Sequence, residues 1–356
     1  MMNINEILLQ AAERKASDVH IGVGHVPMIR INGELQPLNN RKTSAQDTIS
    51  YVQILLSGVQ SKILSEKGQV DFAYQTPNGY SYRMNVFRYR DYYGFACRLV
   101  HHQIPTIAQL ELPQQIEKIA KMQSGLVIVA GPTGCGKTTT IASIVDVINT
   151  TRRLHILTIE DPIEYIYQDK MSMITQREIG RDCNNFYEAL HAGLRQDPDV
   201  IVVGELRDLE TMQTAITAAE TGHLVLVTLH TRNAQQTIER IIDVFPSGQQ
   251  QQIRFQMASS LNAVISQRLI PRMDEVTRIP AVEILFVTPA IRTLIREGKA
   301  HQINSFIQTG RRNGMQTIDD HLSYLFKKGS ISLETLKQYT TDEDYVFSKS
   351  GTMSME

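Results

Sequence analysis

The feature that most constrains this chain is the segment 126–140, LVIVAGPTGCGKTTT, in which a short apolar run leads into the pattern G-x-x-x-x-G-K-[ST]. Its glycines let successive backbone N–H groups point at one anion, and Lys137 supplies a charge for the outer phosphates. The apolar spacing over 139–148 predicts a helix whose N-terminus faces those phosphates. Because strand, loop and helix signals follow in this order, we predict bound nucleotide rather than an empty glycine-rich turn. The predicted contacts are Gly131, Pro132, Thr133, Gly134, Cys135, Gly136, Lys137, Thr138 and Thr139.

Composition narrows the class of protein. The 356 residues suffice for two or three domains, and 42% apolar with 21% charged residues is usual for a soluble globular chain. A net charge of −1 gives no global attraction to nucleic acid, so no direct nucleic-acid partner is expected. The sequence has no apolar run near the roughly 20 residues of a membrane span and no secretion signal. Three isolated cysteines, Cys97, Cys135 and Cys183, indicate a reducing cytoplasm.

The first hundred residues predict a small domain that mixes helices with an antiparallel sheet. Its last strands, within 70–100, carry Arg83, Arg88, Arg90 and Arg98, which form either a functional cluster or a solvated basic face. Residues 101–124 contain two prolines and predict a linker that runs into a helix. The helices are expected at 4–16 and 45–64, and the early strands at 19–23, 28–31 and 35–38.

From residue 125 onward, strands alternate with helices, which predicts an α/β domain with a parallel sheet covered on both faces. The strand candidates are nearly continuous apolar runs, at 126–130, 154–159, 200–203 and 224–229. Functional side chains should follow the carboxyl ends of such strands. Residues 246–330 turn helical, and 341–356 are polar and expected to be mobile. The predicted boundaries are therefore 1–100, 101–124, 125–335 and a flexible tail, 336–356.

Acidic and histidine side chains flank the predicted strands of this domain, close to where functional side chains are expected. The second strand is followed by Glu160, Asp161 and Glu164, and a carboxylate there can orient or deprotonate a water molecule. The third strand runs into Glu205, placed to support a metal ion beside the phosphate loop. The fourth strand is bracketed by His223 and His230. The alternatives are a polar loop for the acids and buried structural roles for the histidines.

Four motifs in order resemble a known family, the secretion-type ATPases, and most closely the type IV pilus retraction ATPases. GPTGCGKTTT is similar to the Walker A motif of that family and ILTIEDPIEY, 156–165, to its Asp box. DPDVIVVGELRD, 197–208, is similar to its Walker B motif and AAETGHLVLVTLHT, 218–231, to its His box. AIRTLIRE, 290–297, resembles the retraction signature, and ASDVHI, 16–21, resembles the entry into a PAS-like domain. The resemblance implies a RecA-like P-loop ATPase domain behind a smaller α+β PAS-like domain.

The resemblance also implies roles for individual residues. Lys137 and Thr138 would bind the phosphates and Mg²⁺ of ATP, with Glu205 supporting the metal. Glu164 would position or activate water, and His230, with His223, would sense the γ-phosphate. Arg83 and Arg98 would reach the active site of a neighbouring subunit, since the family is hexameric.

The same resemblance implies a setting for the chain. We expect a homohexamer at the cytoplasmic face of the inner membrane that acts on a pilus platform protein and works beside a paralogous pilus ATPase. Two departures stand out: Cys135 replaces the usual Ser and Thr293 the usual Asn. The long N-terminal extension and tetracysteine motif of many assembly ATPases are not in this sequence, which disfavours an extension motor. The alternatives are a motor of a type II or type IV secretion system and, in another class, a nucleotide-binding regulator without turnover.

Overall fold

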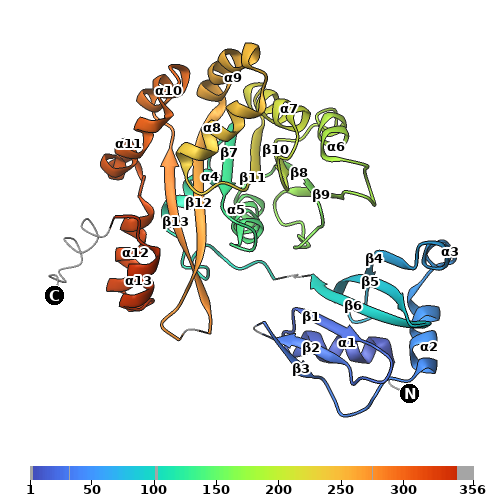
Figure 1. Ribbon diagram of the computed structural model, residues 1–356. Coiled ribbons are helices and arrows are strands. Elements are labelled where there is room, and N and C mark those ends of the chain that lie inside the picture. Colours follow the sequence, from blue (N-terminus) through green and yellow to red (C-terminus); the bar gives the residue numbers. More distant parts are fainter. Residues whose placement is uncertain (1–2, 32, 101–102, 275, 343–356) are drawn as a thin grey trace. The chain divides into compact units, whose positions relative to one another are not determined.

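The structure is a computed structural model that describes residues 3–31, 33–100, 103–274 and 276–342. The chain divides into two compact units: the residues up to Gln103 together with Glu164–Ile166 belong to the first, and the rest of the chain from Ile104 belongs to the second. Figure 1 shows both. The predicted linker over 101–124 is wrong for most of its length. Ile107, Leu112, Ile116 and Ile119 are buried in the core of the second unit, because they are apolar and pack against its sheet.

The first unit contains an antiparallel six-stranded sheet in the order β3-β2-β1-β6-β5-β4. Its predicted second helix is two helices, because Ser57 starts a new capping box with Gln60. The elements are α1 (Ile4–Glu13), β1 (Asp18–Ile21), β2 (Met28–Ile31), β3 (Glu34–Pro37), α2 (Ala45–Leu55), α3 (Gly58–Lys67), β4 (Gln69–Gln75), β5 (Ser81–Tyr89) and β6 (Tyr92–Val100).

Side chains alternate across the strands of this first sheet. On β5 the buried residues Tyr82, Met84 and Val86 face the apolar core. The residues between them point to the opposite face and stay polar. That alternation places Arg83 outside the core, on the face it shares with Arg98 of β6.

The second unit is built on a seven-stranded sheet in the order β13-β12-β7-β11-β10-β8-β9, parallel except for the β12–β13 hairpin. All four predicted strands are present. The prediction that 246–330 is helical is wrong over β12 and β13, whose Val and Ile side chains are buried in the sheet. The strands are β7 (Gly125–Ala130), β8 (His155–Glu160), β9 (Met173–Glu178), β10 (Val200–Val203), β11 (Leu224–Leu229), β12 (Leu261–Pro271) and β13 (Arg278–Phe286).

Helices cover both faces of this sheet (Figure 1). The α4–α5 side packs on Val127 and Val129, and the α6–α9 side packs on Leu126 and Ile128. The helices are η1 (Gln114–Ile116), α4 (Glu117–Ala120), α5 (Lys137–Thr151), α6 (Phe186–Gly193), α7 (Leu209–Glu220), α8 (Ala234–Val244), α9 (Ser247–Ser260), α10 (Pro289–Arg296), η2 (Ala300–Gln302), α11 (Ile303–Thr309), η3 (Gly310–Asn313), α12 (Ile318–Lys327) and α13 (Leu333–Tyr339).

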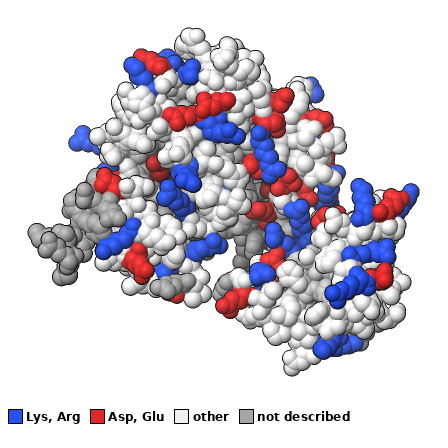
Figure 2. Space-filling view, viewed as in Figure 1, with Lys and Arg blue, Asp and Glu red and all other residues white. Residues whose placement is uncertain are grey.

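The predicted flexible tail begins too early. Leu336 lies in α13 and is fully buried, and the Asp319 carboxylate accepts hydrogen bonds from Thr340 and Thr341. Residues 343–356 of the predicted tail lie outside the described residues. Within the described ranges, no helix is both long and apolar enough to cross a bilayer. Figure 2 shows Lys and Arg interspersed with Asp and Glu over the visible face of the second unit.

One buried histidine in α12 makes this unit sensitive to acid. The Val282 N–H donates to His321 Nδ1 at 3.0 Å, and burial lowers the pKa of His321 from 6.5 to about 4. Between those values the unfolded chain binds a proton that the folded chain does not. Stability is therefore lost as pH falls, by about 3 kcal/mol once the pH reaches 4.

We expect His321→Asn, whose amide oxygen can accept the Val282 bond, to flatten this acid dependence. Urea titrations at pH 7 and pH 4 should show a smaller difference in unfolding free energy than in the parent. His301→Asn, at an exposed histidine, is the matched control and should follow the parent. An unchanged acid dependence in His321→Asn would contradict the assignment.

Candidate functional site

The phosphate loop is shaped by the strand before it and the helix after it. All six residues of β7 are buried, so the chain leaves the sheet at a fixed point at Gly131. Gly134 and Gly136 have φ of +74° and +88°, a left-handed conformation that L side chains rarely adopt. Gly136 caps α5, whose first turn carries Lys137 and therefore presents backbone N–H groups to the loop.

Lys137 is held inside this loop. Its side chain is buried, and Nζ donates to the carbonyl oxygens of Gly131 at 2.9 Å and Pro132 at 3.1 Å. A buried ammonium is costly unless it is hydrogen-bonded, so these contacts fix the charge where a phosphate would bind. The role of Lys137 in binding phosphate stays a prediction.

The structure brings Glu205 and His230 to the same place. His230 follows β11 and Glu205 follows β10; these strands are parallel neighbours, and β11 also pairs with β7. His230 Nε2 lies 3.0 Å from Glu205 Oε1, and its Nδ1 lies 3.4 Å from Lys137 Nζ. Three of the predicted motifs therefore meet through side-chain contacts. A histidine bonded on both nitrogens is well placed to link the carboxylate to the phosphate loop.

The three acids after β8 have different surroundings. Glu160 is buried and accepts hydrogen bonds from Thr158 and Gln176. Asp161 lies 4.0 Å from Arg207. Glu164 is exposed and makes no hydrogen bond or ion pair within the described part of the chain. The geometry leaves the role of Glu164 as a prediction.

His223 lies far from the phosphate loop of the same chain, so the prediction that it contacts the nucleotide bound there is wrong. His223 precedes β11, and its backbone carbonyl accepts a hydrogen bond from Gly125, the first residue of β7. The phosphate loop follows the other end of β7, which is about 20 Å away along a six-residue strand. The His223 ring instead lies 3.0 Å from the Ala218 carbonyl oxygen, a structural contact at the turn after α7.

Arg83 and Arg98 lie together in the first unit, directly opposite each other on β5 and β6. Like charges in that register repel, and an ion pair offsets the repulsion: Arg98 Nε donates to Asp18 Oδ1 at 3.0 Å. Burial opposes ionisation of Asp18, but hydrogen bonds from Ser17 and Arg98 outweigh it and lower the pKa of this carboxyl. The Arg98 side chain remains 72% exposed, so its terminal nitrogens face solvent.

The residues present fit a magnesium ion that arrives with a nucleotide. Mg²⁺ is usually bound by one or two protein groups, phosphate oxygens and water rather than by an all-protein cage. Thr138 in the first turn of α5 offers a hydroxyl, and Glu205 offers a carboxylate. Among the described residues, no three or more His, Cys, Asp or Glu side chains come together as a metal site. A Mg²⁺ ion bound mainly by phosphate oxygens and water does not need such a group.

Sequence reasoning missed two residues that shape the site. Arg207 donates to Glu205 Oε2 at 2.8 Å and so fixes one oxygen of that carboxylate. Gln267 of β12 donates to the Cys135 carbonyl oxygen at 2.6 Å and accepts from Thr140 at 2.7 Å, which ties the loop to α5. Arg207 lies within the third motif and could have been found there. Gln267 is more than 120 residues from its partners and carries no local signal.

Cys135 takes part in the loop through its backbone. Burial raises the pKa of its thiol, although the nearby Lys137 opposes the shift. The side chain is 3% exposed. The thiolate is therefore scarce at neutral pH, and we expect Ser in its place to have little effect.

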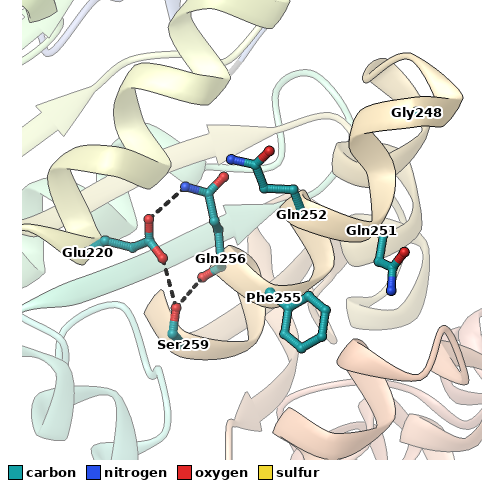
Figure 3. Close-up of a pocket in the computed structure, with 7 residues that line it drawn as sticks. All are labelled: Glu220, Gly248, Gln251, Gln252, Phe255, Gln256 and Ser259. Atoms are coloured by element: carbon teal, nitrogen blue, oxygen red, sulfur yellow. Dashed lines mark hydrogen bonds between the residues drawn. The ribbon is translucent and has the colours of Figure 1, made fainter.

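A hollow of about 550 Å³ on α7 and α9 contains none of the predicted site residues. Figure 3 shows Gln256 and Ser259 of α9 pointing toward Glu220, whose carboxylate accepts from both, at 2.7 and 3.0 Å. Exposed Phe255 lies on the same helix. We assign this hollow no part in the chemistry, because the phosphate loop, Glu205 and His230 lie elsewhere.

The chain is similar to several known proteins. The model of the family described as "Type II/IV secretion system protein" matches residues 1–356. The "Type IV pilus retractation ATPase PilT" of Pseudomonas aeruginosa is 42% identical over 337 residues, covering 95% of this chain and 98% of that protein. A "Twitching motility protein" of Neisseria gonorrhoeae is 44% identical over 312 residues, covering 88% of this chain and 83% of that protein. The crystal structure of the pilus retraction motor PilT with bound ADP matches with a TM-score of 0.89 and 43% identity, covering 97% and 99% of the two chains.

Proposed function

Because the chain belongs to the family of type II/IV secretion system proteins, we propose that it is an ATPase motor that retracts type IV pili. Two relatives above 40% identity support this, one named a pilus retraction ATPase and the other a twitching motility protein. The observation that carries the proposal is the contact chain from Lys137 through His230 to Glu205. It joins the phosphate loop to a carboxylate at the carboxyl edge of the sheet, which is where ligands bind in sheets of this kind.

In this proposal each group acts on ATP in a defined way. The backbone of the loop and Lys137 hold the β- and γ-phosphates, and Thr138 with Glu205 holds Mg²⁺, which neutralises charge on the phosphates when it is bound. Glu164 orients or deprotonates the attacking water. His230 senses the γ-phosphate, and the contacts of its ring with Lys137 and Glu205 support this role.

The proposal includes an assembly. Arg83 and Arg98 of one subunit would complete the site of its neighbour in a homohexamer, since an arginine supplied in trans stabilises charge in the transition state. The exposed terminal nitrogens of Arg98 fit this role. The ring would work at the cytoplasmic face of the inner membrane on a pilus platform protein, beside a paralogous pilus ATPase.

A second candidate is a motor of a type II or type IV secretion system, which the description of the family favours. A nucleotide-binding regulator is a third, of a different class. The retained acids Glu164 and Glu205 favour turnover over regulation.

Imaging of labelled pili in cells whose own copy carries Glu205→Gln tests the proposal. We expect pili to extend but retraction events to become at least tenfold rarer, because the variant weakens the carboxylate that supports Mg²⁺ and bonds His230. Glu210→Gln, at an exposed acid in α7, is the matched control and should retract like the parent. Retraction at the parental frequency in Glu205→Gln would contradict the proposal, and loss of secretion with intact retraction would favour the second candidate.

A further inference from the structure

A cavity of about 560 Å³ lies between the segment that leads into α4 and the helix α12. This volume is within the roughly 300–1,000 Å³ of pockets that hold small molecules. One wall includes Glu111 and Leu112, and the other includes Met315, His321 and Tyr324. All the residues that line the cavity belong to the second unit, and none of them is a predicted nucleotide contact. The cavity therefore shares no wall with the phosphate loop.

His321 offers a hydrogen-bond donor at this cavity. Its side chain is 3% exposed, and its Nδ1 accepts the Val282 N–H at 3.0 Å. Because a backbone N–H can only donate, Nδ1 carries no proton, and the proton of the neutral ring is on Nε2. Burial lowers the pKa of His321 to about 4, so the ring is neutral at pH 7. No residue in the described ranges accepts from Nε2–H, so an acceptor bound in the cavity would complete the bonding of this ring.

Two cations line the same cavity and keep free donors. Arg311 donates to Asp320. Lys328 Nζ donates to Glu111 Oε2 at 2.6 Å, and Arg272 donates to Glu111 Oε1 at 2.5 Å, so both oxygens of this carboxylate are already bonded. A guanidinium has five N–H donors and an ammonium three, so Arg311 and Lys328 each keep donors beyond one ion pair. Donors on charged groups bind an anionic acceptor most strongly.

The rest of the cavity offers a flat ring and apolar contact. Tyr324 is 56% exposed, and its ring stacks on His321 with the centroids 6.1 Å apart and the planes at 14°. Leu112 and Met315 are apolar, and both are buried. A second ring placed against Tyr324 removes apolar area from water, and aromatic pairs gain free energy beyond that area. These contacts favour a ligand with a flat ring over an aliphatic acid.

We propose that this cavity binds a small organic anion that carries a flat ring. The acid group of the ligand accepts from His321 Nε2–H and from the free donors of Arg311 and Lys328, and its ring lies against Tyr324. A carboxylate and a phosphate share this chemistry, so the experiment includes both. The site is separate from the proposed nucleotide site, and the inference does not depend on the proposed function.

Titration of the full-length protein, followed by ¹⁹F NMR, tests the inference with 6-fluoro-2-naphthoate, 6-fluoro-2-naphthyl phosphate and the neutral 6-fluoro-2-naphthamide. We expect at least one of the two acids to bind the parent with a Kd below about 1 mM, the range for a ligand of this size. The amide has the same ring but no charge, so we expect it to bind at least about tenfold more weakly. The tighter of the two acids identifies the acid group that the site prefers.

Two variants place the bound acid in the cavity. His321→Asn keeps an acceptor for the Val282 N–H but loses Nε2–H, and Arg311→Gln removes a cation whose side chain is 58% exposed. Each should weaken the acid at least about tenfold, the value of a hydrogen bond to a charged group. Arg312→Gln is the matched control, because Arg312 is the exposed neighbour of Arg311 and does not line the cavity. It should bind the probes like the parent.

Three results would overturn the inference: neither acid bound below about 1 mM, the amide bound as tightly as the acids, or the acids bound equally well by the parent and both cavity variants. The last result would place the probe at another site, such as the phosphate loop. Urea titration verifies that His321→Asn is folded, and Arg311→Gln keeps the test decisive if it is not. Phosphate release from the parent is unaffected by any of these outcomes, so failure here is distinct from failure of the proposed function.

Discussion

Lys137→Ala is expected to abolish detectable nucleotide binding and to lower phosphate release by about 10³-fold or more. The reason lies in the geometry: Nζ is buried in the loop, 2.9 Å from the Gly131 carbonyl oxygen, and is the cation placed for the outer phosphates. Alanine removes this positive charge, so that only the backbone N–H groups of the loop remain to bind the phosphates. Calorimetric titration with ATP and a phosphate-release assay measure both effects.

The control for this substitution is Lys121→Ala, at an exposed lysine that follows α4. It removes the same charge from the same unit and should leave binding and turnover unchanged. Parental ATP affinity and turnover in Lys137→Ala would show that the loop does not hold the phosphates, and the proposed function would then fail at its first step.

Glu164→Gln should separate binding from chemistry. We expect ATP affinity within about threefold of the parent and phosphate release lower by about 10²- to 10⁴-fold, the usual contribution of a positioned acid or base. The amide keeps the size of the side chain but cannot accept a proton. Equilibrium binding and single-turnover phosphate release measure the two quantities on one preparation.

Asp161→Asn is the matched variant in the same loop. Asp161 lies 4.0 Å from Arg207 and is not the predicted base, so its loss should slow turnover less than tenfold. If Asp161→Asn stops turnover while Glu164→Gln does not, the assignment of the water-activating group is wrong.

Much of the second unit follows from local patterns. The four strands predicted from apolar runs are present, and the glycines of the phosphate loop have the positive φ that the motif requires. Glu205 and His230 could be placed together because the carboxyl ends of parallel strands share one edge. His223 precedes its strand and therefore lies at the opposite edge of the sheet, which a motif match alone does not reveal.

Other features depend on contacts that no local pattern records. The segment around Ile107 and Leu112 resembles a linker, and only the sheet that it packs on makes it part of the core. The β12–β13 hairpin does not follow from the sequence pattern, because its buried β-branched runs fit helix or strand equally well. Gln267 supports the phosphate loop from β12, more than 120 residues along the chain, so only the fold reveals it.

The most direct test of the account is phosphate release from mixtures of Arg98→Ala and Lys137→Ala subunits. Each variant alone should be nearly inactive, since one lacks the arginine given to the neighbour and the other lacks its own phosphate contact. Random mixing in equal amounts leaves about a quarter of the subunit interfaces with both groups intact, so we predict activity up to about a quarter of the parent's. Subunit exchange is verified by mixing labelled subunits of the two variants. Activity that stays at the level of the separate variants at every ratio, with exchange verified, would contradict the account.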